Sequence, residues 1–310
     1  MGRLPETLPN LSLARAGLAR HAERRLDPEL LPAALADPRT RVLELHGDRV
    51  QVEQQADGPA LVLRAPRPTD GSGLVLYLGE DGDGTAYLAV AGPPPADGEP
   101  TRLSGLRQVG ADLGDRDATI FATSLALANW HAAHTHCPRC GAATEPVQAG
   151  WLRRCTSDGT EHYPRTDVAV IMSVLDDDDR LLLARGAGWD TGRFSVLAGF
   201  LEPGESLAAA VAREVHEEVG LEVTDVEYLG DQPWPFPTSL MVGFTTRAVG
   251  RDLRLQESEI AEARWFTREE YREVLAAGGV SASTRLSIAR RIIERWLGHG
   301  LDEVARRRGS

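Results

Sequence analysis

The sequence predicts an α/β protein in which a mixed sheet lies between helices, and three observations support this class. Short apolar strands alternate with two helical patterns in the C-terminal half of the chain. One of these helices, Leu207–Val219, carries clustered glutamates and follows a loop that contains glycine. A segment that contains all three cysteines separates this half from an N-terminal half with strands and one long helix.

These patterns divide the chain into three parts. The 310 residues suffice for two domains of ordinary size. We expect a structural α+β domain over residues 1–130, a short cysteine-containing segment over 131–165 and the α/β domain over 166–300. No pattern in the first part indicates catalysis, so we expect it to be architectural.

The N-terminal part is predicted from alternating apolar runs and turn residues. The expected elements are strands at Leu43–Val52, Ala60–Leu63, Leu74–Leu78 and Tyr87–Val90, a proline-rich loop at Ala91–Pro100 and a helix at Ala118–Ala133. An arginine-rich amphipathic stretch at Leu11–Arg25 is interpreted as a surface helix, because Glu6 and Glu23 are atypical of a transit peptide.

The C-terminal part alternates strands and helices. The expected strands are Val168–Leu175, Arg180–Ala184, Ser195–Ala198, Val226–Leu229, Leu240–Arg247 and Ala263–Phe266, and the expected helices are Leu207–Val219 and Ser283–Trp296. The acidic turn Asp176–Asp179 is predicted to be solvated.

Composition excludes several classes of function. All 34 basic residues are arginine, which rules out chemistry that needs a lysine nucleophile. The formal net charge of −12 argues against a duplex nucleic-acid binder. An acidic enzyme can still bind an anionic substrate when divalent cations bridge the two, so a metal is expected.

Cysteine usage and hydropathy indicate the compartment. Three cysteines are too few for a disulfide framework, and Cys137 and Cys140 have the spacing of metal ligands. The sequence contains neither an apolar run long enough to cross a membrane nor a secretory signal. We therefore expect a cytoplasmic protein without a membrane partner.

The residues that carry the chemistry lie on the helix Leu207–Val219. Glu214, Glu217 and Glu218 are spaced so that all three project from one face. Such close like charges repel one another, and a solvated acidic face would explain neither Gly199 nor Gly220. Clustered carboxylates suit Mg²⁺ or Mn²⁺, which would relieve the repulsion.

Three glycines in this stretch have predicted roles in the backbone. Gly199 and Gly204 are predicted to form a tight turn before the helix. Gly220 fits the helix C-terminus, where a left-handed residue is favoured.

The stretch from Gly199 to Leu221 resembles the Nudix box at every fixed position, and the chain is identified as a member of the Nudix hydrolase family. The resemblance implies a Nudix fold over 166–300, with Glu214, Glu217 and Glu218 as ligands of Mg²⁺ or Mn²⁺. It also implies that Glu205 and Arg213 brace the loop against the helix. A further carboxylate is expected from Glu259, with Glu262 as the alternative. The bound metal would neutralise diphosphate oxygens and activate a water for in-line attack.

A second motif indicates the subfamily. The run QPWPFPTS from Gln232 to Ser239 resembles the signature of the NADH pyrophosphatase subfamily, with Asp231 in place of its first serine. A proline-stiffened loop bearing Trp234 and Phe236 offers flat surfaces for nucleotide rings. The resemblance implies hydrolysis of NADH or NAD⁺ to nicotinamide mononucleotide and AMP, removal of NAD caps from RNA 5′ ends, and a homodimer.

By the same resemblance, nine residues bind the substrate. They are Phe200, Tyr163, Trp234, Phe236, Gln232, Ser239, Met241, Ile171 and Ala289. For Ile171, Met241 and Ala289, packing in the core is an equally good interpretation.

A third resemblance is to the zinc ribbon of the subfamily, over 131–165. Cys137, Cys140 and Cys155 occupy three of its four cysteine positions, and Asp158 occupies the fourth. Zinc accepts carboxylate and imidazole ligands, so Asp158 or His162 could complete the site. Alternatively, the site is vestigial.

Two other functions are weighed against this hypothesis. One is hydrolysis of another dinucleotide, such as ADP-ribose or a diadenosine polyphosphate, which the QPWPFP run disfavours. The other is a catalytically silent nucleotide-binding module, which the intact glutamate set disfavours.

Overall fold

The computed structural model describes residues 7–92, 103–281 and 283–302. The chain divides into two compact units. We call Met1–Ser12, Asp167–Gln232 and Ser239–Ser310 the C-terminal unit, and Leu13–Thr166 with Pro233–Thr238 the N-terminal unit. None of the helices in the described residues has the length and apolar character that a membrane span requires.

A mixed sheet forms the centre of the C-terminal unit. Within the described residues it has six strands in the order β14-β15-β11-β12-β16, and β13 also pairs with β11. The strands are β11 (Asp167–Leu175), β12 (Leu181–Gly186), β13 (Leu197–Phe200), β14 (Glu222–Trp234), β15 (Ser239–Val249) and β16 (Ile260–Phe266). β11 runs parallel to β15 and antiparallel to β12 and β13, so the expected mixed sheet is confirmed.

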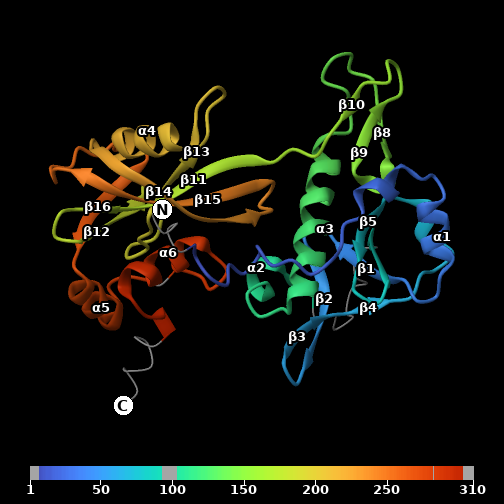
Figure 1. The fold of residues 1–310 in the computed structure, drawn as a ribbon, viewed down its shortest axis with the longest axis horizontal. Helices are drawn as coiled ribbons and strands as arrows, with labels where there is room; N and C mark the ends of the chain where they lie inside the picture. Colours follow the sequence, from blue (N-terminus) through green and yellow to red (C-terminus); the bar gives the residue numbers. More distant parts are fainter. Residues whose placement is uncertain (1–6, 93–102, 282, 303–310) are drawn as a thin grey trace, which may run out of the picture. The chain divides into compact units, whose positions relative to one another are not determined.

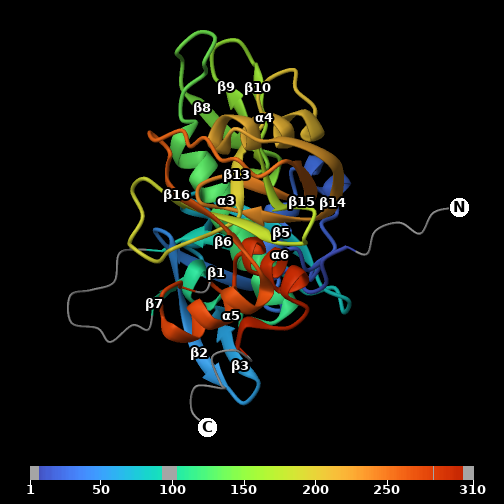
Figure 2. The ribbon, with the colours of Figure 1, turned by 90° about the vertical axis from the view of Figure 1, so that its left-hand side faces the viewer.

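Helices cover both faces of this sheet. α4 (Leu207–Val219) lies on one face, and α6 (Ile288–Leu297) lies on the other (Figure 1, Figure 2). α5 (Arg268–Ala277) lies near α6 in both views. Alternate residues of β11 point to opposite faces, so Val170 joins the core beneath α4 and Ile171 joins the core beneath α6. The sheet therefore holds α4 by burial of apolar side chains.

The N-terminal unit contains a second mixed sheet. Its strands are β1 (Arg41–His46), β2 (Arg49–Gln55), β3 (Gly58–Leu61), β4 (Leu63–Arg64), β5 (Val75–Glu80), β6 (Ala86–Ala91) and β7 (Leu103–Gly105). Its helices are α1 (Leu30–Ala36), α2 (Leu106–Val109) and α3 (Asp115–Ala133), with short 3-10 turns at Ala22–Leu26, Asp70–Ser72 and Gln148–Gly150. A separate small sheet joins β8 (Thr144–Val147), β9 (Leu152–Cys155) and β10 (Glu161–His162).

Two predictions about elements were wrong. The strand expected at Leu43–Val52 is a hairpin of β1 and β2, because Gly47 has φ +67° and turns the chain. The helix expected at Leu11–Arg25 is absent. Leu11 is instead buried in the core of the C-terminal unit, and Ala19 forms an antiparallel bridge with Glu80. Tertiary burial and backbone pairing thus override the helical pattern.

One further element differs in extent. The helix expected from Ser283 begins at Ile288, because the side chain of Ser287 caps it by accepting a hydrogen bond from the Ala289 amide. Of the proline-rich loop expected at Ala91–Pro100, residues 93–100 lie outside the described residues.

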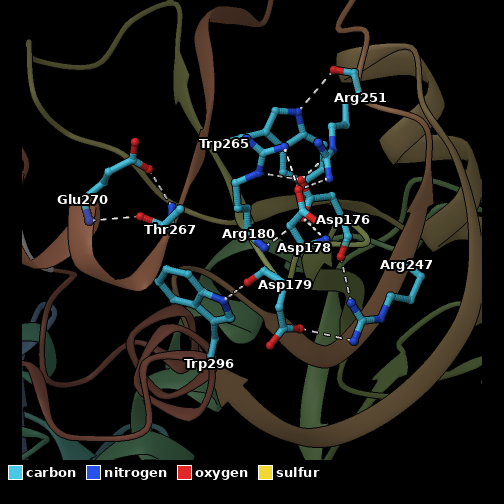
Figure 3. A network of polar contacts seen from close by, with 10 residues as sticks. All are labelled: Asp176, Asp178, Asp179, Arg180, Arg247, Arg251, Trp265, Thr267, Glu270 and Trp296. Atoms are coloured by element: carbon cyan, nitrogen blue, oxygen red, sulfur yellow. Dashed lines mark hydrogen bonds and ion pairs between the residues drawn. The ribbon is translucent and has the colours of Figure 1, made fainter.

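The acidic turn between β11 and β12 is solvated at Asp177 and Asp178, as predicted, but not at Asp176 (Figure 3). Asp176 is 1% exposed, and its carboxylate accepts hydrogen bonds from the backbone and guanidinium of Arg180. Arg251 approaches the same carboxylate at 2.9 Å. Burial alone would raise the pKa of Asp176, but these hydrogen bonds and positive charges outweigh it, so the pKa lies below its usual value. The turn therefore organises a cluster of arginines.

Candidate active site

Helix α4 positions the predicted metal ligands. The Ser206 side chain caps its first turn by accepting from the Ala209 amide, and Gly220 ends it in the left-handed conformation with φ 73°. Glu214 and Glu218 are buried, whereas Glu217 lies on the exposed side of the helix. The predicted common face is thus present, with two of its carboxylates held away from water.

Glu218 lacks the partner that a buried carboxylate requires. Its Oε2 atom is buried and accepts no hydrogen bond from the described residues. Burial, followed by repulsion from Glu214, Glu259 and Glu217, raises the pKa of Glu218 to about 8. Burial also raises the pKa of Glu214, against the opposing effect of Arg213. An orphaned oxygen among mutually repelling carboxylates suits a divalent cation.

Glu259 lies near this cluster, whereas Glu262 is engaged elsewhere. The charge of Glu259 acts on both Glu214 and Glu218. Glu262 faces Arg185, with 3.8 Å between its carboxylate and the guanidinium. The structure thus supports the preference for Glu259.

Arg213 connects the glutamates to the preceding loop. Its guanidinium donates to both carboxylate oxygens of Glu205, at 2.8 and 3.0 Å, and to Glu214 and Glu217, each at 2.9 Å. It also donates to the Phe200 carbonyl at 3.0 Å. The pairing of Glu205 with Arg213 is therefore present, and Arg213 orients two of the glutamates as well.

Gly199 does not have the predicted role. It lies in β13 rather than in a tight turn. A Cβ atom at this position would lie 1.8 Å from Cδ of Glu214, so only glycine leaves room for that carboxylate. The turn itself uses Gly204, whose φ is +89°.

A pocket of about 380 Å³ opens beside the glutamates. Its lining includes Glu218 and Glu259, together with Trp189, which the sequence analysis did not single out. Residues of β12 and β13 form part of the remaining wall.

The predicted substrate-binding residues differ in accessibility. Phe200 and Tyr163 are 61% and 66% exposed, as rings that receive a ligand would be. Ile171 and Ala289 are buried in the core beneath α6. Gln232 is fully buried, and its amide donates to the Leu286 carbonyl at 2.9 Å, which holds the segment before α6. Ser239 and Met241 are partly exposed on β15.

The aromatic loop is held by residues that the sequence analysis missed. The rings of Trp234 and Phe236 meet edge to face at 4.9 Å. Within the N-terminal unit, the Arg107 guanidinium lies 3.8 Å from the centroid of Phe236 and 5.0 Å from that of Trp234. The Asn129 amide donates to the carbonyls of Pro235 and Pro237 at 3.2 and 3.0 Å. Neither residue belongs to a motif, so no sequence signal marked them.

The cysteine segment brings together the four predicted zinc ligands. One ligand atom each from Cys137, Cys140, Cys155 and Asp158 lies within 4.8 Å of the others. Sγ of Cys140 and Sγ of Cys155 are 3.4 Å apart. This set of three sulfurs and one oxygen fits a tetrahedral zinc ion.

Comparison with known proteins agrees with this arrangement. The model of the Nudix domain matches residues 164–285. The NADH pyrophosphatase zinc ribbon domain matches residues 132–163, and the NADH pyrophosphatase-like rudimentary Nudix domain matches residues 39–130. The mixed sheet, the glutamate-bearing helix α4 and the strand β13 that contains Gly199 thus have the features of a Nudix hydrolase.

Individual relatives are similar over nearly the whole chain. The NAD-capped RNA hydrolase NudC of Mycobacterium bovis is 41% identical over 305 residues, which cover 92% of this chain and 94% of that protein. The protein of the same name from Mycobacterium tuberculosis matches to the same extent. Human NAD-capped RNA hydrolase NUDT12 is 38% identical over 197 residues, 60% of this chain and 43% of that protein. The chain therefore belongs to the NADH pyrophosphatase branch of the Nudix hydrolase family.

Proposed function

We propose that this protein hydrolyses the diphosphate bond of NADH and NAD⁺, giving nicotinamide mononucleotide and AMP, and removes NAD from the 5′ end of RNA. The observation that carries the proposal is the buried, unpartnered Glu218 beside Glu214 and Glu259. The names of the relatives, which are NAD-capped RNA hydrolases, support the choice of substrate.

The four carboxylates share one task in this proposal, and neighbouring residues position them. Glu214, Glu217, Glu218 and Glu259 hold Mg²⁺ or Mn²⁺, which when bound neutralises the diphosphate oxygens and activates water. Arg213 keeps Glu214 and Glu217 oriented through its 2.9 Å contacts. Gly199 leaves the space that the Glu214 carboxylate occupies.

Substrate recognition is assigned to aromatic surfaces. Phe200 and Tyr163 are exposed rings that can stack on a nucleotide base. Trp234 and Phe236 form a rigid aromatic pair, and Arg107 lies over both rings. Ser239 and Met241 remain candidates for contacts with substrate, whereas Ile171, Ala289 and Gln232 support the site from the core.

Turnover of NADH, NAD⁺, ADP-ribose and NAD-capped RNA, measured side by side, tests the function. We expect nicotinamide mononucleotide and AMP from NADH, and one monophosphate product labelled by ¹⁸O-water. Phe200→Ala should reduce NADH cleavage about 5- to 100-fold, and cleavage of ADP-ribose less, since stacking on a ring contributes about 1–3 kcal/mol. Release of inorganic phosphate as the primary product, or faster turnover of ADP-ribose than of NADH, would contradict the proposal.

The cofactor, assembly and compartment complete the proposal. Three cysteines and Asp158 hold one structural zinc ion, which their proximity supports. The family resemblance supports a homodimer, which light scattering at several protein concentrations tests. A monomer that is fully active would exclude the dimer as a requirement. We also propose that the protein acts in the cytoplasm, where its thiols stay reduced.

A further inference from the structure

An exposed arginine, Arg193, lies over an aromatic ring that lines the pocket beside the glutamates. Trp189 lines the pocket that contains Glu218 and Glu259, and it is 37% exposed. The Arg193 guanidinium lies 4.5 Å from the centroid of the Trp189 ring. The side chain of Arg193 is exposed and forms no ion pair with any carboxylate among the described residues.

Three other arginines of this unit are held by carboxylates. Arg185 faces Glu262, Arg213 is bound by three glutamates, and Arg251 is held by the acidic turn. Arg193 instead contacts an aromatic ring, which leaves its N–H groups directed to solvent or to a ligand.

The indole is held in a fixed position beneath the guanidinium. A Cβ at Gly186 would lie 3.2 Å from both Cε2 and Nε1 of Trp189, so the ring packs against the Gly186 backbone. The Trp189 amide donates to the Gly186 carbonyl at 3.0 Å, which closes the turn. Trp189 therefore acts as a platform that orients Arg193.

We propose that Arg193, stacked on Trp189, binds the phosphate on the 3′ side of the adenosine in NAD-capped RNA, and so favours capped RNA over free NAD⁺. Free NAD⁺ has a hydroxyl at that position, so this phosphate distinguishes the two substrates. A guanidinium binds phosphate through paired hydrogen bonds, and stacked arginine–aromatic pairs are typical of sites for single-stranded nucleic acid.

Charge explains why a single arginine matters here. The chain has a net charge of −12 and no lysine, and the pocket itself contains two glutamates. An RNA backbone is repelled by such a surface, whereas bound metal compensates only the diphosphate. The Arg193 guanidinium supplies positive charge at the rim, where the RNA chain would leave the pocket.

This inference rests on the proposed function, and a matched arginine serves as the control. Arg264 is also exposed and stacked, 4.8 Å from the centroid of Phe266, but the ring that it contacts does not line the pocket, whereas Trp189 does. The experiment compares kcat/KM for a short single-stranded NAD-capped RNA with kcat/KM for NAD⁺. In Arg193→Ala the ratio of the two should fall about tenfold, the effect of losing one charge-assisted hydrogen bond, and in Arg264→Ala it should not change.

Salt dependence and the conservative variant test the assigned roles. Removing one phosphate contact should reduce the slope of log kcat/KM for capped RNA against log salt by about 0.7. Trp189→Phe keeps a ring under Arg193 and should retain the preference for capped RNA, whereas Trp189→Ala should lose it. An unchanged ratio in Arg193→Ala, or an equal fall in Arg264→Ala, would overturn the proposal.

A binding measurement separates this inference from the proposed function. Calorimetry with Mg²⁺ compares adenosine 3′,5′-bisphosphate with AMP. The bisphosphate should bind about tenfold more tightly to the unmodified protein and with equal affinity to Arg193→Ala. If that result is found while NAD⁺ is not hydrolysed, the phosphate site stands and the proposed function fails. If NAD⁺ is hydrolysed but the bisphosphate has no advantage, the phosphate site fails alone.

Discussion

The position of the Glu214 carboxylate requires that residue 199 has no Cβ atom. Gly199 and Glu214 are fifteen positions apart in the sequence, yet the hydrogen of Gly199 occupies the only space beside the Glu214 carboxylate. Glu218 lies in the same cluster with one oxygen unpartnered. The carboxylates of the cluster therefore repel one another.

Gly199→Ala should move the Glu214 carboxylate and lower kcat by at least about tenfold, since small displacements of a metal ligand are costly. The fold should survive, because Gly199 has an ordinary strand conformation. Steady-state kinetics measure the fall in kcat, and a thermal unfolding curve measures whether the fold survives. The matched control is Gly188→Ala, where a Cβ meets no atom within 4 Å. Equal activity in both variants would show that the close approach is unimportant.

Glu218→Gln should lower kcat by orders of magnitude, because it removes a metal ligand. It should also change the pH dependence of stability without metal. Folded Glu218 keeps its proton up to a pKa of about 8, whereas the unfolded chain loses it near 4.5. The free energy of unfolding should therefore fall as the pH rises from about 4.5 to about 8.

Thermal unfolding in a chelator, at several pH values, measures this slope. Glu218→Gln should flatten it, and added Mg²⁺ should raise the melting temperature most above pH 8, where the site is fully ionised. A slope that is the same in wild type and variant would show that Glu218 titrates normally.

At the scale of elements, charge pairing replaces apolar packing at the end of the central sheet. Asp176 in the turn between β11 and β12 is bound by Arg180 and Arg251, and Arg247 donates to its carbonyl at 2.8 Å. Arg247 lies on β15, and its contact therefore links that strand to the turn (Figure 3). No pattern in the sequence predicts this contact between distant segments.

Asp176→Asn should destabilise the protein by about 1–3 kcal/mol, because buried hydrogen bonds to charged groups are lost. The pKa of Asp176 is lowered in the folded state, so the stability it contributes is present above pH 3.8 and is lost as the pH falls through the folded pKa. Denaturant unfolding at pH 7 measures the effect. Asp177→Asn changes an exposed neighbour in the same turn and should be close to neutral; comparable losses in both variants would refute the assignment.

On the scale of the whole molecule, the small sheet of β8, β9 and β10 carries the compact cluster of three cysteines and Asp158. Its three short strands enclose little apolar surface, and the ligand atoms of four side chains lie within 4.8 Å. Small folds of this kind are commonly stabilised by a metal. A bound zinc ion would tie the turn with Cys137 and Cys140 to the turn with Cys155 and Asp158.

Elemental analysis after dialysis should find about one zinc ion per chain. Asp158→Ala should weaken or abolish zinc binding, and His162→Ala should retain it, because only Asp158 belongs to the compact ligand set. The opposite pattern would make His162 the fourth ligand. A zinc-free protein with full activity would mean that the ribbon is vestigial.

Periodicity and motifs were sufficient for much of the molecule. The helical pattern at Leu207–Val219 matches α4 at both ends, because Ser206 and Gly220 are capping residues with local effects. The common face of Glu214, Glu217 and Glu218 follows from helix geometry alone. The mixed sheet between helices was likewise expected, because the stretch from Gly199 to Leu221 resembles the Nudix box.

Contacts between distant segments were decided only by the tertiary structure. Leu11 is not helical, because it packs into a core with residues more than 150 positions away in the sequence. Asn129 and Arg107 contact an aromatic loop that lies more than 100 positions further along the chain. Gly199 was recognised by its motif, but its reason, the carboxylate of Glu214, appeared only in three dimensions. The sequence by itself determined what local geometry and residue chemistry impose: the helix, its caps, the glutamate face and the family. Tertiary structure decided burial and unpaired charge, because both depend on neighbours that no local pattern encodes.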